Sequence, residues 1–502
     1  MSETGPLRSI LIVGGGTAGW MAAAALCHFL RGTDTQITLV ESSRISTVGV
    51  GEATLPTLRG FHSVLGIDER EFLRATQASF KLGIRFDGWR HAGHSFFHPF
   101  CPYGAPLGPA PFFQYWARAQ AEGYAFPLQD FSYSAVMARK ERFAQPAVNP
   151  PAPFADYAYA FHFDAGLYAG FLRDYATKRG VSCLDATISS TTRDGETGHI
   201  ASVVTEDGQA LTADLFIDCT GFRSLLLGGV LGVAYDNWSH WLPADRAVAI
   251  PCAKAGAMTP YTIATAMEAG WRWRIPLQHR TGNGYVYASA FCDEDTAISQ
   301  LTSALDGAPL ADANRIRFTT GRRKVFWQGN CVGLGLTTGF LEPLESTSIA
   351  LIQSGISKLL TFFPTRAFDP DLIAEANDAF SQEVERVRDF IILHYKANRR
   401  DDGELWRYCR NMAVPETLER KMRLFAKIGQ TLSFAHESFE TPSWETMYAG
   451  FDHLPAALDR RVFDMPGEDL VASLERIRTT IESHSDRLAL HGTYLDRLLT
   501  AG

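Results

Sequence analysis

The sequence predicts an α/β fold in which the last third of the chain is mostly helical. A buried strand, a glycine turn and the start of a helix follow one another over residues 9–20. Two later apolar runs, near residues 213–221 and 329–335, also end in small-residue turns. Beyond residue 366, apolar residues recur every three or four positions with charges between them, which is the spacing of core-facing helices. These observations favour a parallel sheet with crossover helices, followed by a helical region.

The first of these elements carries glycines at positions 14, 16 and 19. Gly14, Gly16 and Gly19 fit the G-x-G-x-x-G spacing, which permits the turn, the approach of a pyrophosphate and close helix packing. The next apolar run, residues 36–40, ends in Glu41, where an acidic residue meets a ribose hydroxyl in such βαβ units. The pattern predicts that this end of the chain binds a dinucleotide.

The two later strands favour FAD over NAD as that dinucleotide. Residues 213–221 form a buried strand and a turn, and they resemble the second flavin-contacting strand of FAD-dependent monooxygenases. Residues 329–335 resemble the third, although Asn330 stands where Asp is more usual. Each segment taken alone is equally compatible with an ordinary strand of a parallel sheet.

A turn at residues 341–349 combines a carboxylate with hydroxyl and backbone donors. Pro343 fixes its own φ and moves its predecessor out of the helical region, and the hydroxyl residues 346–348 offer N-cap chemistry to the apolar stretch that follows. We expect a helix to start here, with N–H groups able to bind a small anion. The alternative is a capped helix with a solvated Glu345.

Lys81 lies in an alternating run from Ser79 to Asp87, which predicts one strand with Lys81 on the face opposite to the apolar residues. Without further context this polar face is a solvated one, shared with Arg85 and Asp87. The apolar residues that alternate are Phe80, Leu82, Ile84 and Phe86.

Most of the chain resembles a flavin-dependent halogenase of the tryptophan halogenase family. The W-x-W-x-I-P block at residues 271–276 is the most specific mark, because flavin hydroxylases that otherwise share the fold lack it. The resemblance rests on residues 14–20, 49–54, 80–81, 98–100, 271–276 and 342–347.

The resemblance implies a FAD-binding Rossmann-like flavin monooxygenase fold with a mostly helical C-terminal region. Residues 1–90 are the first part of the FAD-binding core, and residues 91–155 are an irregular segment that covers the substrate. Residues 156–365 continue the core with an inserted sheet and the halide turn, and residues 366–502 contribute helices to the substrate pocket.

The chemistry implied by the resemblance begins with reduced FAD from a separate flavin reductase, which with dioxygen and chloride or bromide gives hypohalous acid. The acid travels to Lys81, which holds it by a hydrogen bond or as a haloamine; the sequence leaves both open. Glu345 stabilises the cationic arene and takes its proton. A carboxylate at about 4 Å supplies roughly 4 kcal/mol at an effective dielectric near 20.

The resemblance also assigns binding residues. Halide is expected at Thr347 and Ser348; tryptophan-specific members carry Gly at the second position, but backbone N–H donors survive that change. The substrate is expected between His98, Pro99, Phe100 and Trp444. The residues expected to contact FAD are Gly14, Gly16, Thr17, Ala18, Gly19, Glu41, Arg44, Val50, Ala53, Ile188, Asp218, Gly221 and Leu336.

Residues 432–444 lack the paired tyrosines and the acidic residue that hold the backbone of free tryptophan in the family. We therefore expect indole, a substituted indole or another electron-rich aromatic as the substrate. Two alternatives remain open at this point: an FAD-dependent aromatic hydroxylase and a non-catalytic FAD-binding redox protein.

Composition agrees with a large enzyme. The 502 residues are 46% hydrophobic and 20% charged, and the net charge of −8 argues against a nucleic-acid partner. The eight cysteines include no C-x-x-C pair, so we expect neither a metal site nor a disulfide framework. No apolar run reaches the roughly 18 residues of a membrane span, and no signal segment precedes the first strand. We expect a cytoplasmic protein, and a homodimer is compatible with the sequence.

Overall fold

The computed structural model describes residues 5–45, 51–154 and 157–500. Its contacts divide the chain into two compact units, each built from three separate segments. Unit 1 comprises Met1–Gln77, Phe163–His240 and Phe318–Glu385, and unit 2 comprises Ala78–His162, Trp241–Arg317 and Arg386–Gly502. These units are defined by contacts in space, whereas the sequence predicted four consecutive segments. The predicted division is therefore not tested and stays a prediction.

The main sheet of unit 1 has the predicted parallel core, with β1 at its centre between β2 and β12. The strand expected from residues 329–335 pairs in parallel with β12, and β21 closes that edge in the antiparallel direction. The sheet runs in the order β21 (Trp327–Gln328), β22 (Cys331–Gly333), β12 (Leu215–Asp218), β1 (Ser9–Val13), β2 (Gln36–Glu41) and β8 (Ser182–Asp185).

Helices pack around this sheet. The central helix is α1 (Thr17–Phe29), which contacts both α6 (Ala165–Thr177) and α8 (Thr347–Thr361). Unit 1 also contains α2 (Thr57–Leu65), α3 (Glu69–Ala75), the first part of α9 (Pro370–Lys396) and two small antiparallel sheets. One is β9 (Ile188–Arg193), β10 (Ile200–Thr205) and β11 (Ala210–Leu211); the other is β13 (Tyr235–Asn237), β20 (Gly321–Arg323) and β23 (Gly339–Phe340).

The hydrogen bonds of Asn330 explain why an amide stands where Asp is more usual. Its side-chain oxygen accepts from the Ile200 N–H at 2.9 Å, and its amide donates to the Ile200 and Asp214 carbonyls. An amide can serve an N–H and two carbonyls at once, which a carboxylate cannot do. Asn330 therefore joins β10 to the main sheet of unit 1.

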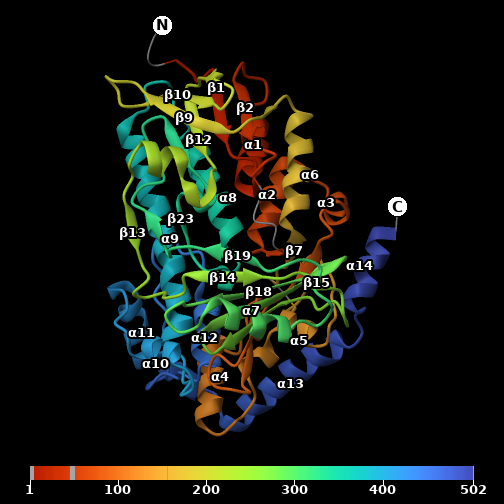
Figure 1. Cartoon of the computed structure of the whole chain (residues 1–502). Helices are drawn as coiled ribbons and strands as arrows, with labels where there is room; N and C mark the ends of the chain where they lie inside the picture. Colours follow the sequence, from red (N-terminus) through yellow and green to blue (C-terminus); the bar gives the residue numbers. More distant parts are fainter. Residues whose placement is uncertain (1–4, 46–50, 155–156, 501–502) are drawn as a thin grey trace. The chain divides into compact units, whose positions relative to one another are not determined.

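Unit 2 is built on a larger mixed sheet. A meander of β16, β17 and β18 forms its middle, and β5 joins β16 in parallel. Helix α7 (Glu294–Ser303) packs on β14 and β18 (Figure 1). The order is β19 (Asn314–Arg317), β14 (Arg246–Ala249), β18 (Arg280–Tyr287), β17 (Gly270–Pro276), β16 (Thr262–Met267), β5 (Gly83–Asp87) and β6 (Ser95–Pro99), with β15 (Cys252–Ala253) paired to β18.

The strand predicted from Ser79 to Asp87 is broken at Leu82, so the expectation of one continuous strand is wrong. The first half is β4 (Ser79–Lys81), which pairs with β7 (Ala160–Asp164), and the second half is β5 in the larger sheet. Between them, the Leu82 N–H donates to the Pro260 carbonyl and its own carbonyl accepts from Phe100. The four alternating apolar residues are all fully buried, because the chain passes from one sheet to another.

The segment 91–155 is less irregular than predicted. It contains β6, α4 (Phe112–Ala121), a short 3-10 turn and α5 (Tyr133–Arg139). Phe113, Tyr115 and Trp116 of α4 are buried, so the aromatic run forms a packed helix rather than a loop. The Ser132 hydroxyl caps α5 by accepting from the Ala135 N–H.

The C-terminal third is helical, as predicted. Both apolar stripes are buried: Phe380, Val384, Val387 and Ile391 on α9, and Leu470, Leu474, Ile477 and Ile481 on α13. The helices of this region are α10 (Glu404–Asn411), α11 (Glu416–Ile428), α12 (Thr441–Gly450), α13 (Gly467–Ser485) and α14 (His491–Thr500).

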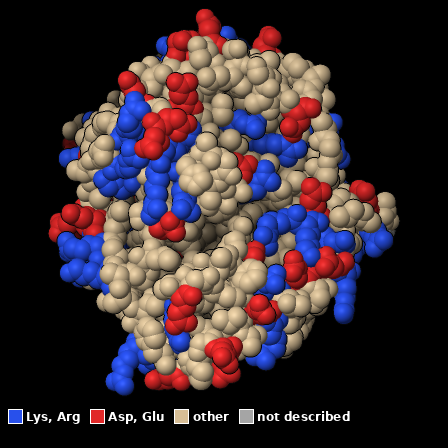
Figure 2. Space-filling model, turned by 90° about the horizontal axis from the view of Figure 1, so that it is seen from below, with Lys and Arg blue, Asp and Glu red and all other residues tan. Residues whose placement is uncertain are grey.

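Basic and acidic side chains are interspersed on the face of the molecule that Figure 2 presents. All eight cysteine thiols are free. Within residues 5–45, 51–154 and 157–500, no helix combines the length and the apolar character needed to cross a membrane.

Candidate active site

The glycine turn of unit 1 is tight enough to exclude any side chain. Gly14 has φ +112°, and a Cβ there would lie 2.3 Å from the Cys219 carbonyl oxygen. A Cβ on Gly19 would lie 1.9 Å from the Gly14 carbonyl oxygen. Gly16 precedes α1 without a side-chain cap, and no acidic residue lies in the first turn, which begins with Thr17 and Ala18. The N–H groups of that turn are thus left to bind an anion such as a pyrophosphate.

Glu41 ends β2 beside this turn, as predicted. A Cβ on Gly15 would lie 1.7 Å from a Glu41 carboxylate oxygen. The carboxylate accepts from the Trp20 indole N–H at 3.2 Å and pairs with Arg173 at 3.0 Å. These contacts hold the carboxylate against the glycine turn, where it is placed to accept from a ribose hydroxyl.

Asp218 has a structural role that the sequence did not predict, because its carboxylate accepts hydrogen bonds from its own loop. One oxygen accepts from the N–H and hydroxyl of Thr220, and the other accepts from the N–H groups of Leu226 and Leu227 at 2.8 Å each. Gly221 follows with φ +67°. Asp218 therefore shapes the turn after β12, and any contact with a flavin stays a prediction.

The other residues expected at the cofactor have mixed surroundings. Ile188 packs against the core of unit 1, and Ala53 is buried in the short strand β3 (Gly51–Ala53). Leu336 lies half-buried in a 3-10 turn. Arg44 is exposed, donates to the Thr187 hydroxyl at 2.8 Å and pairs with Glu206. Val50 lies outside the described residues.

The turn before α8 differs from a capped helix. Pro343–Glu345 forms a 3-10 turn, Ser346 has φ +60° without a side-chain cap, and α8 begins at Thr347. The helix start is confirmed, whereas the expected side-chain capping is wrong because Ser346 adopts a left-handed rather than an extended conformation. Glu345 is fully buried, which overturns the alternative of a solvated carboxylate.

The residues at this helix end fit a halide. The Thr347 hydroxyl is buried without a hydrogen-bond partner among the described residues, and Ser348 is half-buried beside it. A buried hydroxyl without a partner costs free energy, which a bound anion would recover. Together with the N–H groups of the uncapped first turn of α8, it supplies hydrogen-bond donors to a small anion.

In unit 2, Lys81 is fully buried, which overturns the solvated strand face. Its Nζ lies 5.0 Å from the centre of the Phe100 ring. Diagonally across β4 and β7 lies His162, whose Nε2 is 2.9 Å from the Thr262 hydroxyl and whose Nδ1 is 3.4 Å from the Ser79 hydroxyl. Burial, followed by the charge of Lys81, holds the pKa of His162 well below its ordinary value.

The hydrogen bonds fix the tautomer of His162. Ser79 donates its hydroxyl hydrogen to the Pro276 carbonyl at 2.8 Å, so toward Nδ1 it can only accept. Nδ1 therefore carries the hydrogen, and the neutral ring accepts from Thr262 at Nε2. Lys81 thus has a neutral, rigidly held imidazole as its neighbour.

The expected substrate residues His98 and Trp444 belong to one aromatic cluster. Phe390 stacks on Phe439 with ring centres 4.0 Å apart and meets Trp444 edge-on at 5.0 Å. His98 lies 5.8 Å from Phe390 and 6.3 Å from Phe439. Pro99 is buried at the end of β6, and Phe100 follows it half-buried.

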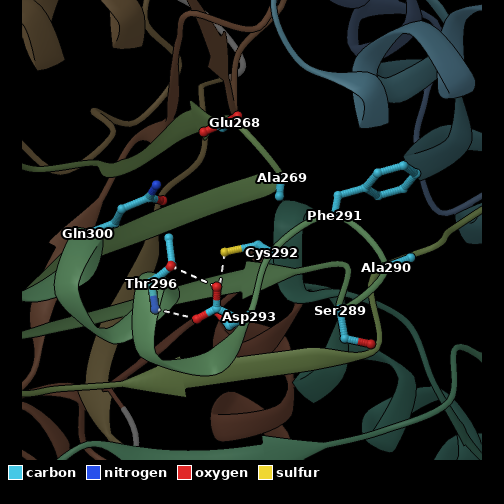
Figure 3. Close-up of a pocket in the computed structure, with 9 residues that line it drawn as sticks. All are labelled: Glu268, Ala269, Ser289, Ala290, Phe291, Cys292, Asp293, Thr296 and Gln300. Carbon is cyan, nitrogen blue, oxygen red and sulfur yellow. Dashed lines mark hydrogen bonds between the residues drawn. The ribbon is translucent and has the colours of Figure 1, made fainter.

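A separate recess of unit 2, with a volume near 430 Å³, contains none of the expected site residues (Figure 3). Its main polar group, Asp293, accepts from the N–H and hydroxyl of Thr296 and so caps α7. Because the recess contains none of the expected site residues, we do not assign it to the active site.

The family model for tryptophan halogenase matches residues 9–467 of this chain. The chain belongs to the tryptophan halogenase family. Among curated relatives, tryptophan 6-halogenase SttH of Streptomyces toxytricini is 38% identical over 436 residues, covering 82% of this chain and 83% of SttH. Tryptophan 7-halogenase RebH of Lentzea aerocolonigenes is 36% identical over 446 residues, covering 84% of this chain and 82% of RebH.

The fold agrees with this family throughout. The solved structure of BrvH, a flavin-dependent halogenase from Brevundimonas sp. BAL3, superposes with a TM-score of 0.95 at 45% identity. The alignment covers 98% of this chain and 99% of BrvH. The predicted family, fold class and kind of enzyme are thereby confirmed, and an aromatic hydroxylase is not favoured.

The W-x-W-x-I-P block of this halogenase has a structural explanation in unit 2. Trp271 and Trp273 lie on β17 and are buried, with ring centres 6.1 Å apart. The block ends in Pro276, whose carbonyl accepts from Ser79 on the strand that carries Lys81. The block therefore helps to fix the position of the lysine strand.

Sequence reasoning missed four polar residues of unit 2. Ser79 and His162 show no motif of their own and become visible only through the pairing of β4 with β7. Glu445 and Tyr448 lie on α12 beside Trp444, where helical spacing from the tryptophan was the one available signal.

Proposed function

We propose that this halogenase uses reduced FAD, dioxygen and chloride or bromide to halogenate indole or another electron-rich aromatic. The observation that carries the proposal is the fully buried Lys81, held beside a neutral imidazole and against the Phe100 ring. Burying a lysine costs free energy of folding, so a buried primary amine is more readily explained by a chemical role than by stability. Transfer of an electrophilic halogen is such a role.

Unit 1 supplies the binding groups for the cofactor and the halide. The first turn of α1 and the glycines at 14, 16 and 19 would hold the pyrophosphate, and Glu41 would accept from the ribose. Flavin bound there supplies, when reduced, the hypohalous acid from dioxygen and halide. The Thr347 hydroxyl and the N–H groups at the start of α8 would hold the halide as an anion until it reacts.

Lys81 would receive the hypohalous acid and present its halogen to the arene. The ammonium form can donate a hydrogen bond to the oxidant. The neutral amine can instead attack the halogen, breaking its bond to oxygen; hydroxide leaves and takes a proton from the nitrogen as water, which gives a haloamine. Both forms require that Lys81 keep one orientation. The contacts of Ser79 with Pro276 and of His162 with Thr262 supply that order around its strand.

Glu345 would act on the arene. Attack of the ring on the halogen leaves a cationic intermediate that must lose a proton, and a buried carboxylate can stabilise the charge and accept that proton. Glu345 is fully buried in the 3-10 turn Pro343–Glu345, so its side chain starts from a defined backbone position and is shielded from water.

The aromatic cluster around Phe390 supports a flat aromatic substrate. SttH and RebH are described as tryptophan halogenases. Residues 432–444 of this chain contain no tyrosine and do not match the pattern of paired tyrosines and acid noted above. Indole or a substituted indole is therefore the proposed substrate. The enzyme would draw reduced FAD from a separate flavin reductase and act in the cytoplasm.

The proposed function can be tested with purified protein, a flavin reductase, FAD, NADH and indole, with bromide added or omitted. The expected product with bromide is bromoindole, identified by the paired bromine isotopes in its mass spectrum, and omission of bromide should abolish it. A hydroxylated product that forms without halide would instead indicate the hydroxylase. Absence of any oxygen-dependent turnover would indicate the non-catalytic redox protein.

A further inference from the structure

One face of α12 carries two buried polar side chains without protein partners. Glu445 is 9% exposed and Tyr448 is 3% exposed. The Tyr448 hydroxyl has no hydrogen-bond partner, and no hydrogen bond or salt bridge joins Glu445 to any other residue in the described part of the chain. Buried polar groups are normally paired, so two unpaired ones within one helical turn point to a ligand.

The position of these groups connects them to the substrate residues. With 3.6 residues per turn, Trp444, Tyr448 and Glu445 fall within about 100° of one another around the helix. Trp444 meets the aromatic cluster through Phe390, and Tyr448 stacks on Phe425 with ring centres 3.7 Å apart. An aromatic ring bound beside Trp444 would therefore have Glu445 and Tyr448 among its nearest polar neighbours on α12.

The loop that follows the His98–Phe100 motif faces the same part of α12. Tyr103 is hydrogen-bonded to the Thr446 hydroxyl, next in sequence to Glu445. Burial raises the pKa of Tyr103, and the negative charge of Glu445 adds to that rise. Glu445 thus lies close to a loop that begins only three residues earlier at Phe100, the ring that contacts Lys81.

The nearby cation of Lys421 does not neutralise Glu445. Its Nζ lies 4.2 Å from the centre of the Trp444 ring and donates to the Leu432 carbonyl and to Glu437. These contacts occupy the ammonium group of Lys421, and no interaction of Lys421 contributes to the pKa of Glu445. Burial, with no cation to oppose it, raises the pKa of Glu445 to about 8. A cationic ligand would favour the ionised carboxylate.

We propose that Glu445 and Tyr448 bind a protonated amine on the substrate, which is an indole-type arene with an alkylamine substituent and no carboxylate. The carboxylate would accept two of the ammonium hydrogens or one with the phenol oxygen taking another, and both groups would gain the partner they lack. A carboxylate on the same substituent would lie beside Glu445 and be repelled. This inference rests on the proposed function.

The test compares tryptamine, which carries the amine, with 3-methylindole, which lacks it, in wild type, Glu445→Gln and Tyr448→Phe. Wild type should show the higher kcat/KM for tryptamine. Glu445→Gln should lower the ratio of the two kcat/KM values on the order of tenfold or more, through KM for tryptamine, because a hydrogen bond to a charged group is lost. Tyr448→Phe should lower it less.

The control is Glu440→Gln, the same chemical change at an exposed residue just before α12, which should leave the ratio unchanged. Equal ratios in wild type and Glu445→Gln would overturn the inference while 3-methylindole turnover still supports the proposed function. No halogenation of either compound by wild type would overturn the proposed function itself. If Glu445→Gln does not fold, a wild-type preference for 3-methylindole over tryptamine overturns the inference.

Discussion

The candidate sites of the two units differ in the groups that form them. In unit 1 the binding groups are mostly backbone: a glycine turn with no room for a Cβ at Gly14 or Gly19, and the uncapped first turns of α1 and α8. In unit 2 they are side chains from distant segments, such as Lys81 on β4, His162 on β7 and Trp444 on α12. Backbone sites accept one kind of ligand, whereas a side-chain site can change its substrate by substitution. We therefore expect substitutions in unit 2 to change the substrate more readily than substitutions in unit 1 change the cofactor.

The strongest test of unit 1 is Glu345→Gln, which keeps the size of the side chain but removes its charge. Turnover of indole should fall on the order of 100-fold, because a transition-state charge loses its stabiliser and a proton its acceptor. Single-turnover rates measured by product mass check this. Glu375→Gln, at an exposed position, serves as the control. A wild-type rate in Glu345→Gln would show that the Glu345 carboxylate has only a structural role in its turn.

A comparison of indole with tryptophan tests the proposed substrate site of unit 2. The kcat/KM for indole should exceed that for tryptophan on the order of tenfold or more, because the carboxylate of tryptophan would be desolvated without a partner. Halogenation should occur at the most nucleophilic ring carbon, with bromide accepted at least as well as chloride. A tryptophan preference with one benzo-ring product, read by NMR, would reveal an amino-acid site in the C-terminal helices.

His162→Phe tests whether the surroundings of Lys81 matter to its chemistry. The change removes the contacts to Ser79 and Thr262, and halogenation should fall by about tenfold as the lysine strand loses its order. Flavin binding and reoxidation, measured by absorbance, should stay as in wild type because they depend on unit 1. His162→Gln, which keeps hydrogen-bonding groups, should recover part of the activity; equal losses in both variants and in flavin reoxidation would indicate general unfolding.

Thr347→Val should have the smallest effect. It removes the buried hydroxyl but leaves the backbone N–H groups, so KM for bromide should rise only about threefold to tenfold with kcat unchanged. Thr361→Val, at the exposed far end of α8, is the matched control. An unchanged KM for bromide in Thr347→Val would place the halide elsewhere.

The same contrast between backbone and side chains explains what the sequence could predict. The parallel strands, the glycine turn and the start of α8 follow from local spacing, so they were correctly predicted. The break at Leu82 was not, because it depends on Pro260 and Phe100, far away in the chain. The hydrogen bonds from Leu226 and Leu227 to Asp218 were not predicted either, because no motif encodes the shape of the turn that supplies them.

The sequence could predict the candidate site residues that lie in family motifs. It could not predict those whose position depends on strand pairing. His162 reaches Lys81 because β4 and β7 pair in one register, and that register is set by contacts of the whole unit rather than by either strand. Glu445 was passed over because a lone carboxylate in a helix is ordinarily solvated; only its burial distinguishes it.

The division of labour between a cofactor half and a lysine-bearing half is tested most directly in Lys81→Ala. Reduced flavin consumed, followed by absorbance under oxygen, is compared with bromoindole formed, using the exposed Lys427→Ala as the control. Lys81→Ala is expected to bind FAD and to reoxidise the reduced flavin at close to the wild-type rate, but to form no bromoindole. Retained bromoindole formation by a well-folded Lys81→Ala enzyme would contradict it.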